Sequence, residues 1–171
     1  LSFKGPGTLW LDGWRVFPKD TGYMKVKPAE IEDLRNSGMA FVRTHGFVKS
    51  GWSYFLEDLT NAPGVLASRG VNSFTPPTTL FSALEFMKQA GVNPWLQIEM
   101  SLDEKEWQGF VEYLAAPYDP AKDSPQSKPW AFKRYSMGQQ KPWTDVFPKF
   151  IFEVSNEQWN PFAMAPWNFP W

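Results

Sequence analysis

Cysteine is absent from the sequence, and histidine occurs only once, at His45. The absence of cysteine excludes disulfides, thiolate metal sites and cysteine nucleophiles together. A single histidine without any cysteine also makes a poor ligand set for a transition metal. We therefore expect that neither a metal nor a cofactor takes part in the function.

The sequence also has no large excess of positive or negative charge. The 17 basic and 18 acidic residues are interleaved and leave a formal net charge of −1. No basic patch indicates nucleic acid, no polybasic run indicates a membrane surface, and no apolar run approaches the length that spans a bilayer. The chain shows no signal peptide and begins at Leu1, which indicates processing or truncation. We expect no nucleic-acid or membrane partner, and a secreted or periplasmic location.

Aromatic residues, in contrast, are abundant. They make up 18% of the 171 residues and include 10 tryptophans, in a chain whose 43% hydrophobic and 20% charged residues are typical of one soluble globular domain. Tryptophan provides large flat contacts, and the C–H faces of sugar rings stack on such surfaces. A single tryptophan is more often a core or loop-anchoring residue, but the set of ten favours a few of them in a carbohydrate site.

A pattern of helix, glycine, apolar strand and polar strand end recurs at residues 38–45, 91–99 and 150–157. The apolar spacing and the Gly and Pro positions predict helices at 28–37, 79–89, 103–114 and 130–135. They predict strands at 8–12, 40–45, 94–99 and 150–155, and a loop rich in Pro and Lys at 117–129.

This repetition is typical of parallel β/α units. Right-handed crossovers place all strand C-termini on one face, and the residues at those ends are Asp12, His45, Glu99 and the pair Asn156-Glu157. In a β/α barrel this face carries the active site. An open doubly wound sheet is the alternative, although no glycine-rich phosphate loop follows the first strand.

The length of the chain allows only part of a barrel. Eight β/α units need roughly 250 residues, whereas four predicted strands reach residue 155 of 171. We therefore predict an α/β fold, the N-terminal half of a (β/α)8 TIM barrel with strands 1 to 4 and long βα loops. Residues 1–171 would form a single catalytic-domain segment, and a second polypeptide could complete the barrel. The apolar segment 161–171 is predicted to belong to a loop that packs on another surface.

The segment from Phe150 to Trp159, with the sequence FIFEVSNEQW, ends a predicted strand with an Asn-Glu pair. It resembles the fourth strand of retaining glycosidases with β/α barrels. The resemblance implies that Glu157 is the general acid/base and that Asn156 binds the hydroxyl next to the anomeric carbon. Such an enzyme needs an acid that protonates the leaving oxygen and then deprotonates a water, and a hydrogen bond to the 2-hydroxyl that strengthens in the transition state.

The segment Val42-Arg43-Thr44-His45-Gly46 resembles the second strand end of glycoside hydrolase family 39, the β-xylosidases and α-L-iduronidases. The resemblance implies that His45 contacts the sugar and that Arg43 lies behind the nucleophile and helps to keep it ionised. A charged Arg43 in a strand also needs a carboxylate partner, for which the nucleophile is a candidate. Residues 88–99 resemble the third unit of the same family, where Glu99 either lies at the strand mouth or pairs with Arg43.

The resemblance covers most of residues 28–160 and fails at two points. The family usually has Trp-Asn-Glu-Pro where this chain has Ser155-Asn-Glu-Gln158. Its nucleophile is a Glu at the end of the seventh strand, so the resemblance implies a nucleophile outside this chain. Glu153 would lie roughly 13 Å from Glu157 by strand rise, which is too far for the separation of about 5–5.5 Å in a retaining pair.

Two tryptophans are predicted to contact substrate. Trp159 lies two residues after Glu157 and would form a platform for a sugar ring, whereas Trp52 would line the entrance from the loop after the second strand. Trp10, Trp95 and Trp107 are predicted to be core residues.

The sequence therefore predicts a retaining glycoside hydrolase that cleaves O-glycosidic bonds in a polysaccharide or oligosaccharide. Two alternatives stay open. One is a non-catalytic carbohydrate-binding protein, and the other is a half-barrel subunit that functions only when a second chain completes it.

Overall fold

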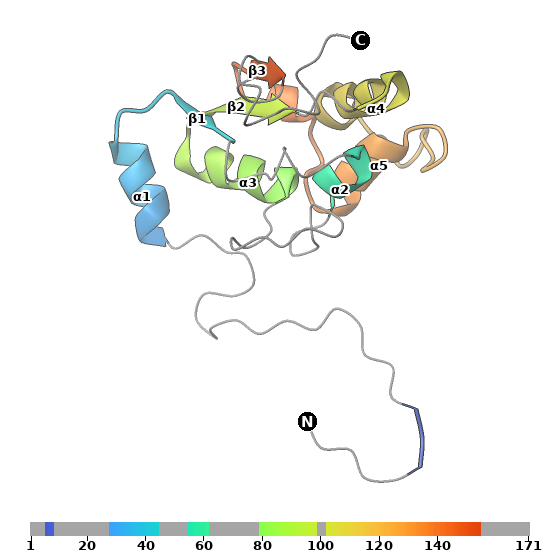
Figure 1. Cartoon of the computed structure of the whole chain (residues 1–171). Coiled ribbons are helices and arrows are strands. Elements are labelled where there is room, and N and C mark those ends of the chain that lie inside the picture. The colour runs from blue at the N-terminus through green and yellow to red at the C-terminus, as the bar shows by residue number, and fades with distance from the viewer. Residues whose placement is uncertain (1–5, 9–27, 45–54, 62–78, 99–101, 155–171) are drawn as a thin grey trace, which may run out of the picture.

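The computed structural model describes residues 6–8, 28–44, 55–61, 79–98 and 102–154 of the chain. Within these ranges, three strands form one parallel sheet in the order β1-β2-β3 (Figure 1). The strands are β1 (Phe41–Arg43), β2 (Asn93–Ile98) and β3 (Ile151–Val154). The register places Arg43 opposite Trp95, and Trp95 opposite Ile151.

In the described ranges, one helix precedes β1, and the other helices lie between β1 and β2 or between β2 and β3 in the chain. They are α1 (Pro28–Asn36), α2 (Leu56–Leu59), α3 (Leu80–Ala90), α4 (Glu104–Ala115), α5 (Pro129–Ser136) and the short 3-10 helix η2 (Trp143–Asp145). In Figure 1, α3 lies along one face of the sheet, and α4 lies on the side of β3 away from α1. The order of helix and parallel strand is that of consecutive β/α units.

The boundaries of α3 and α4 follow from their terminal residues. The Thr79 side chain accepts a hydrogen bond from the Ser82 backbone N–H, and α3 ends at Gly91, whose φ of 74° lies in the left-handed region that glycine adopts without strain. In α4, Asp103 and Glu106 form a reciprocal capping box, because each side chain accepts a hydrogen bond from the backbone N–H of the other.

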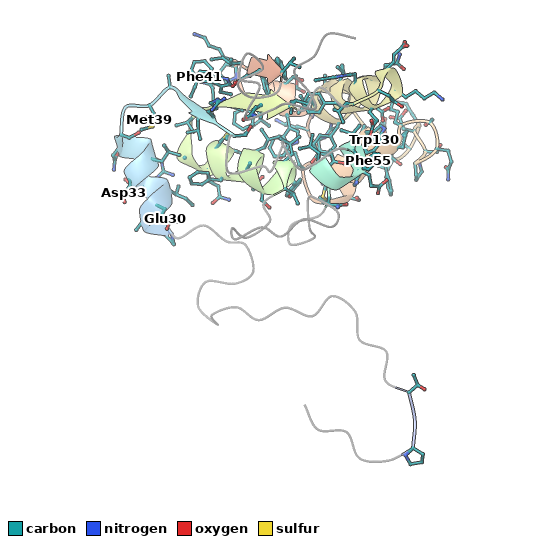
Figure 2. The ribbon with its side chains drawn as sticks, viewed as in Figure 1. Glu30, Asp33, Met39, Phe41, Phe55 and Trp130 are labelled. Carbon is teal, nitrogen blue, oxygen red and sulfur yellow. The ribbon has the colours of Figure 1, made fainter. Side chains whose placement is uncertain are left out.

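The main core lies between α3, the sheet and α4. Its fully or almost fully buried members include Leu84, Met87, Leu96, Phe110 and Trp143. In contrast, α1 buries no residue completely, and its Glu30 and Asp33 are exposed on the outer side of the fold (Figure 2). The core therefore packs on the helix side of the sheet.

Buried Arg134 ties α5 to the end of α4. Its guanidinium donates hydrogen bonds to the carbonyl oxygens of Tyr113 and Ala116, both at 2.8 Å, and to that of Gln139 at 3.3 Å. Burial lowers the pKa of Arg134 from its ordinary value. Three carbonyl acceptors satisfy the donors that burial removes from water.

All four predicted helices and the three predicted strands from residue 40 onward are confirmed to within about two residues where they are described. The predicted ends of those strands, at residues 45, 99 and 155, lie outside the described residues. The short elements α2 and η2 were not predicted. Residues 9–12 of the first predicted strand and the segment 161–171 lie outside the described residues. No helix in the described part of the chain is long and apolar enough to cross a membrane.

All three residues of β1 are only partly buried, because β1 lies at the edge of the described sheet. Val111 of α4 is 60% exposed. Trp95 and Trp107, predicted to be core residues, are partly buried.

Candidate active site

Because the three strands are parallel, their C-terminal ends meet at one edge of the sheet. Of the predicted site residues, Arg43 lies in the described part of the chain, at the end of β1. The others, His45, Trp52, Asn156, Glu157 and Trp159, lie outside it, as does Glu99. What the structure describes is therefore the part of the sheet that leads to the predicted site.

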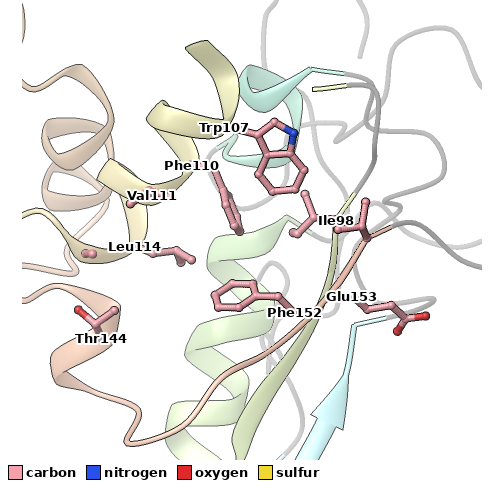
Figure 3. Close-up of a pocket in the computed structure, with 10 residues that line it drawn as sticks. Ile98, Trp107, Phe110, Val111, Leu114, Thr144, Phe152 and Glu153 are labelled. Carbon is pink, nitrogen blue, oxygen red and sulfur yellow. The ribbon is translucent and has the colours of Figure 1, made fainter. Parts of the chain in front are cut away.

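The side chains of the strands alternate between two faces. The register places Arg43, Trp95, Gln97 and Glu153 on one face, and Leu96, Ile98 and Phe152 on the other, which packs toward the helices. Figure 3 shows Phe152 and Glu153 on opposite sides of β3, with Phe152 directed toward α4. The polar face thus carries one cation and one anion, and the helix-facing side is apolar.

The main feature of the polar face is an ion pair between Arg43 and Glu153. The Arg43 Nε donates to Glu153 Oε2 at 2.7 Å, and Nη2 donates to Oε1 at 2.5 Å. Two parallel N–H···O bonds are the bidentate geometry that makes an Arg–carboxylate pair strong and directional. The side chains are 32% and 27% exposed, so the pair is partly shielded from water.

Glu153 is thus the carboxylate partner that a charged arginine in a strand requires. The sequence alone indicates the nucleophile or Glu99 as this partner and offers Glu153 only as a candidate catalytic carboxylate. One signal could have indicated it: residues 43 and 153 both lie two positions before a predicted strand end, on alternating positions that face the same way. The support of a nucleophile by Arg43 stays a prediction.

Trp95 and Gln97 of β2 lie between the two charged residues. The guanidinium carbon of Arg43 lies 5.8 Å from the centre of the Trp95 ring, within the range of a cation–π contact. Gln97 is buried, and its backbone N–H donates to the Thr44 hydroxyl at 2.9 Å. The Thr44 N–H donates in turn to the Trp95 carbonyl at 2.9 Å, which extends the pairing of β1 and β2 toward His45.

The polar face of the sheet offers charged groups and hydrogen-bonding groups. Glu153 is engaged by Arg43 and so does not present a free carboxylate. The described ranges contain no group of three or more His, Asp or Glu residues that could hold a metal ion.

An apolar groove of about 340 Å³ lies on the opposite face, between α4 and β3 (Figure 3). Its lining includes Trp107, Phe110, Val111, Leu114, Phe152 and Val154. Val111, Phe152 and Val154 are 60%, 55% and 50% exposed. Phe152 stacks on Phe150 with ring centroids 5.8 Å apart.

Comparison with known proteins gives a structural likeness only. No family model matches the chain, and no curated protein matches it. Solved structures that are similar include an α-L-arabinofuranosidase from Thermotoga maritima in complex with arabinose, at 18% identity and a TM-score of 0.55. They also include AbfB, a family 51 α-L-arabinofuranosidase from Bifidobacterium longum, at 17% identity and a TM-score of 0.57.

These matches cover 80% and 83% of this chain but only 27% of each arabinofuranosidase chain, so the chain spans about a quarter of their length. Both are glycosidases with a TIM barrel. The fold is therefore mixed α/β with a small parallel sheet, and it is consistent with part of a (β/α)8 barrel.

Proposed function

We propose that this chain is part of a retaining glycoside hydrolase that cleaves O-glycosidic bonds in a polysaccharide or oligosaccharide. The observation that carries the proposal is the parallel order β1-β2-β3. It brings to one edge of a sheet the strands that are followed in sequence by His45, Glu99 and Asn156-Glu157. The fold likeness to two arabinofuranosidases supports the same class of chemistry.

In this proposal, Glu157 is the general acid/base, and the nucleophile lies outside this chain. Glu157 protonates the leaving oxygen in the first step and deprotonates a water in the second. Arg43 supports the ionised nucleophile. The glycone and the rest of the carbohydrate substrate are bound by Asn156, His45, Trp159 and Trp52.

A pentose is the first sugar to test. The sequence resembles family 39, which includes β-xylosidases, and the structural neighbours are named as α-L-arabinofuranosidases. Xylose and arabinose are both pentoses, whereas the iduronic acid of the α-L-iduronidases in family 39 is a hexuronic acid, so the choice of a pentoside rests mainly on the names of the structural neighbours. Membership of family 39 itself stays a prediction, as does a secreted or periplasmic location.

The apolar groove between α4 and β3 favours a barrel that further β/α units complete. In the described part of the chain, β3 pairs only with β2, and the helix-facing side chains of β3 are half exposed. A right-handed β/α crossover from β3 would place the next helix on this side, where the groove would receive it. The groove would receive such a helix equally well from the same polypeptide or from a second one.

Hydrolysis of aryl pentosides tests the proposal. The native protein, together with any polypeptide that co-purifies, is assayed on 4-nitrophenyl α-L-arabinofuranoside and β-D-xyloside. We expect Glu157→Gln to lower kcat on natural oligosaccharides by about 10²–10⁴-fold, as for loss of a general acid. Glu57→Gln, which removes an exposed carboxylate on α2, serves as the control. Sugar binding without hydrolysis in the wild type would instead favour a non-catalytic carbohydrate-binding protein.

A further inference from the structure

A hollow of about 330 Å³ lies between α2 and α5, apart from the groove between α4 and β3. Aromatic rings and prolines line it together with an ammonium, a hydroxyl and a carboxylate: Glu57, Pro125, Pro129, Trp130, Phe132, Lys133 and Ser136. Two features of the sequence that the candidate active site does not account for meet here, the abundance of tryptophan and the segment 117–129 rich in Pro and Lys. The apolar groove, in contrast, offers a ligand almost no polar group.

The ring of Trp130 is held in place from the side of α4. A Cβ at Gly109 would lie 2.4 Å from Trp130 Nε1 and 2.7 Å from its Cδ1, so the pyrrole edge of the indole packs directly on α4. The Trp130 backbone N–H donates to Glu112 Oε1 at 2.9 Å. Trp130, labelled in Figure 2, nevertheless remains partly exposed. The ring is thus positioned before a ligand binds, which lowers the entropy cost of binding.

Polar groups lie beside this ring. Lys133 Nζ lies 5.4 Å from the centre of the Trp130 ring and donates to the Glu57 carbonyl oxygen at 3.1 Å. Ser136 Oγ donates to the Lys133 carbonyl oxygen at 2.9 Å, and a hydroxyl oxygen that donates one hydrogen bond can also accept. The lining includes one cation, Lys133, and one anion, Glu57, so its formal charges balance and favour a neutral ligand.

We propose that this hollow is an ancillary carbohydrate-binding site for a neutral polysaccharide chain. A sugar has apolar C–H faces and polar hydroxyl edges, so it needs an aromatic ring and hydrogen-bonding groups within one hollow. Trp130 supplies the ring, and Lys133 and Ser136 supply hydrogen-bonding groups. The inference rests on the proposed function for the class of ligand, but it does not require that the chain hydrolyses that ligand. The hollow shares no lining residue with the predicted active site.

Affinity electrophoresis of the native protein in gels that contain soluble arabinoxylan tests the inference. We expect Trp130→Met to raise the dissociation constant about three- to tenfold, the scale of one lost aromatic contact. Ser136→Arg places a bulky side chain at an exposed position of the lining and should have a similar effect. Because Ser136 is exposed, this variant also decides the outcome if Trp130→Met fails to fold, as checked by circular dichroism.

Each variant has a matched control outside the hollow. Trp107→Met removes a partly buried tryptophan that lines the apolar groove, and Gln140→Arg adds the same side chain as Ser136→Arg at another exposed position. Both controls should be retarded by arabinoxylan as strongly as the wild type. Hydrolysis gives a second measurement: in Trp130→Met, the ratio of KM on arabinoxylan to KM on 4-nitrophenyl α-L-arabinofuranoside should rise about three- to tenfold.

Weaker retardation of the folded Trp130 and Ser136 variants, with both controls unchanged, supports the inference. Undiminished retardation of either folded variant, an equal loss in the controls, or a wild type that arabinoxylan does not retard would overturn it. If the wild type is retarded through Trp130 but hydrolyses no glycoside, the proposed hydrolase function fails and the carbohydrate site stands. Hydrolysis together with undiminished retardation of the variants gives the reverse result.

Discussion

Arg43 and Glu153 belong to strands separated by β2, yet their side chains meet in a bidentate ion pair on the polar face of the sheet. Each side chain remains about a third or a quarter exposed. The ion pair therefore links two strand ends locally, and we expect it to contribute only modestly to the free energy of unfolding.

Removal of either partner should destabilise the chain only moderately. We expect Arg43→Met and Glu153→Gln each to lower the free energy of unfolding by about 1 kcal/mol, because the remaining charge is partly hydrated. Urea denaturation of both variants and of the double variant gives the coupling energy, expected at about 0.5–1 kcal/mol. The more exposed pair of Lys133 and Glu57, at 3.5 Å, should show almost no coupling in the same cycle. Equal coupling in both pairs would contradict this expectation.

Gly109 should not tolerate a side chain. A Cβ at this position of α4 would lie 2.4 Å from Trp130 Nε1 and 2.8 Å from Leu56 Cδ2, so these two side chains, or the helices that carry them, would have to shift. We expect Gly109→Ala to lower the free energy of unfolding by about 1–3 kcal/mol, although alanine is the better helix former. Thermal denaturation measures the change, and a stabilised Gly109→Ala protein would refute the close packing of Trp130 on α4.

The buried phenol of Tyr113 should cause the free energy of unfolding to fall at high pH. Its side chain is completely buried, and burial raises the pKa of its phenol above the ordinary value. The unfolded chain ionises near pH 10 while the folded chain resists ionisation, so the contribution of Tyr113 is complete below about pH 10 and is lost as the pH rises further. The free energy of unfolding in urea at pH 8 and pH 10.5 should show this loss.

The same experiment on Tyr113→Phe isolates the phenol. The Trp143 indole N–H lies near the Tyr113 hydroxyl, but the two groups do not reach hydrogen-bond geometry. Removal of the hydroxyl should therefore be close to neutral at pH 8, within about 1 kcal/mol, and should reduce the loss of stability between pH 8 and 10.5. A Phe variant with the full wild-type slope would show that other groups cause the alkaline loss.

The groove between α4 and β3 should be dispensable for the fold of the isolated chain. Val111 is 60% exposed there, so Val111→Lys should change the free energy of unfolding by no more than about 0.5 kcal/mol. If further β/α units cover the groove, the same substitution should weaken their association, as measured by size-exclusion chromatography with light scattering of the native sample. A loss above about 2 kcal/mol in the isolated chain would mean that Val111 is already packed.

The repeated β/α pattern could be predicted because local rules set its boundaries. Pro28 at the start of α1, Gly91 after α3 and Asp103 before α4 each act within one helical turn. The short helix α2 was missed because four residues carry too little periodicity. The spacing of residue types along the chain therefore predicts the longer helices and strands, but it does not predict helices of a single turn.

The contacts of the candidate site depend on longer-range information. Arg43 and Glu153 are 110 residues apart, and only the register of two strand pairs brings them together. The exposure of Val111 depends likewise on which element lies next to α4, which the spacing along the helix cannot specify. The residues predicted from family resemblance, Glu157 and Asn156, follow β3 directly, and their roles stay predictions.

The central claim is that Glu157 is the acid/base of a retaining glycosidase, and azide rescue of Glu157→Ala in the native assembly tests it most directly. With an aryl pentoside whose leaving group needs no proton, the glycosyl-enzyme should still form, and its hydrolysis should be slow without a general base. We predict that added azide restores turnover and gives a pentosyl azide of retained configuration. Undiminished hydrolysis of oligosaccharides by Glu157→Ala, with no effect of azide, would contradict the account.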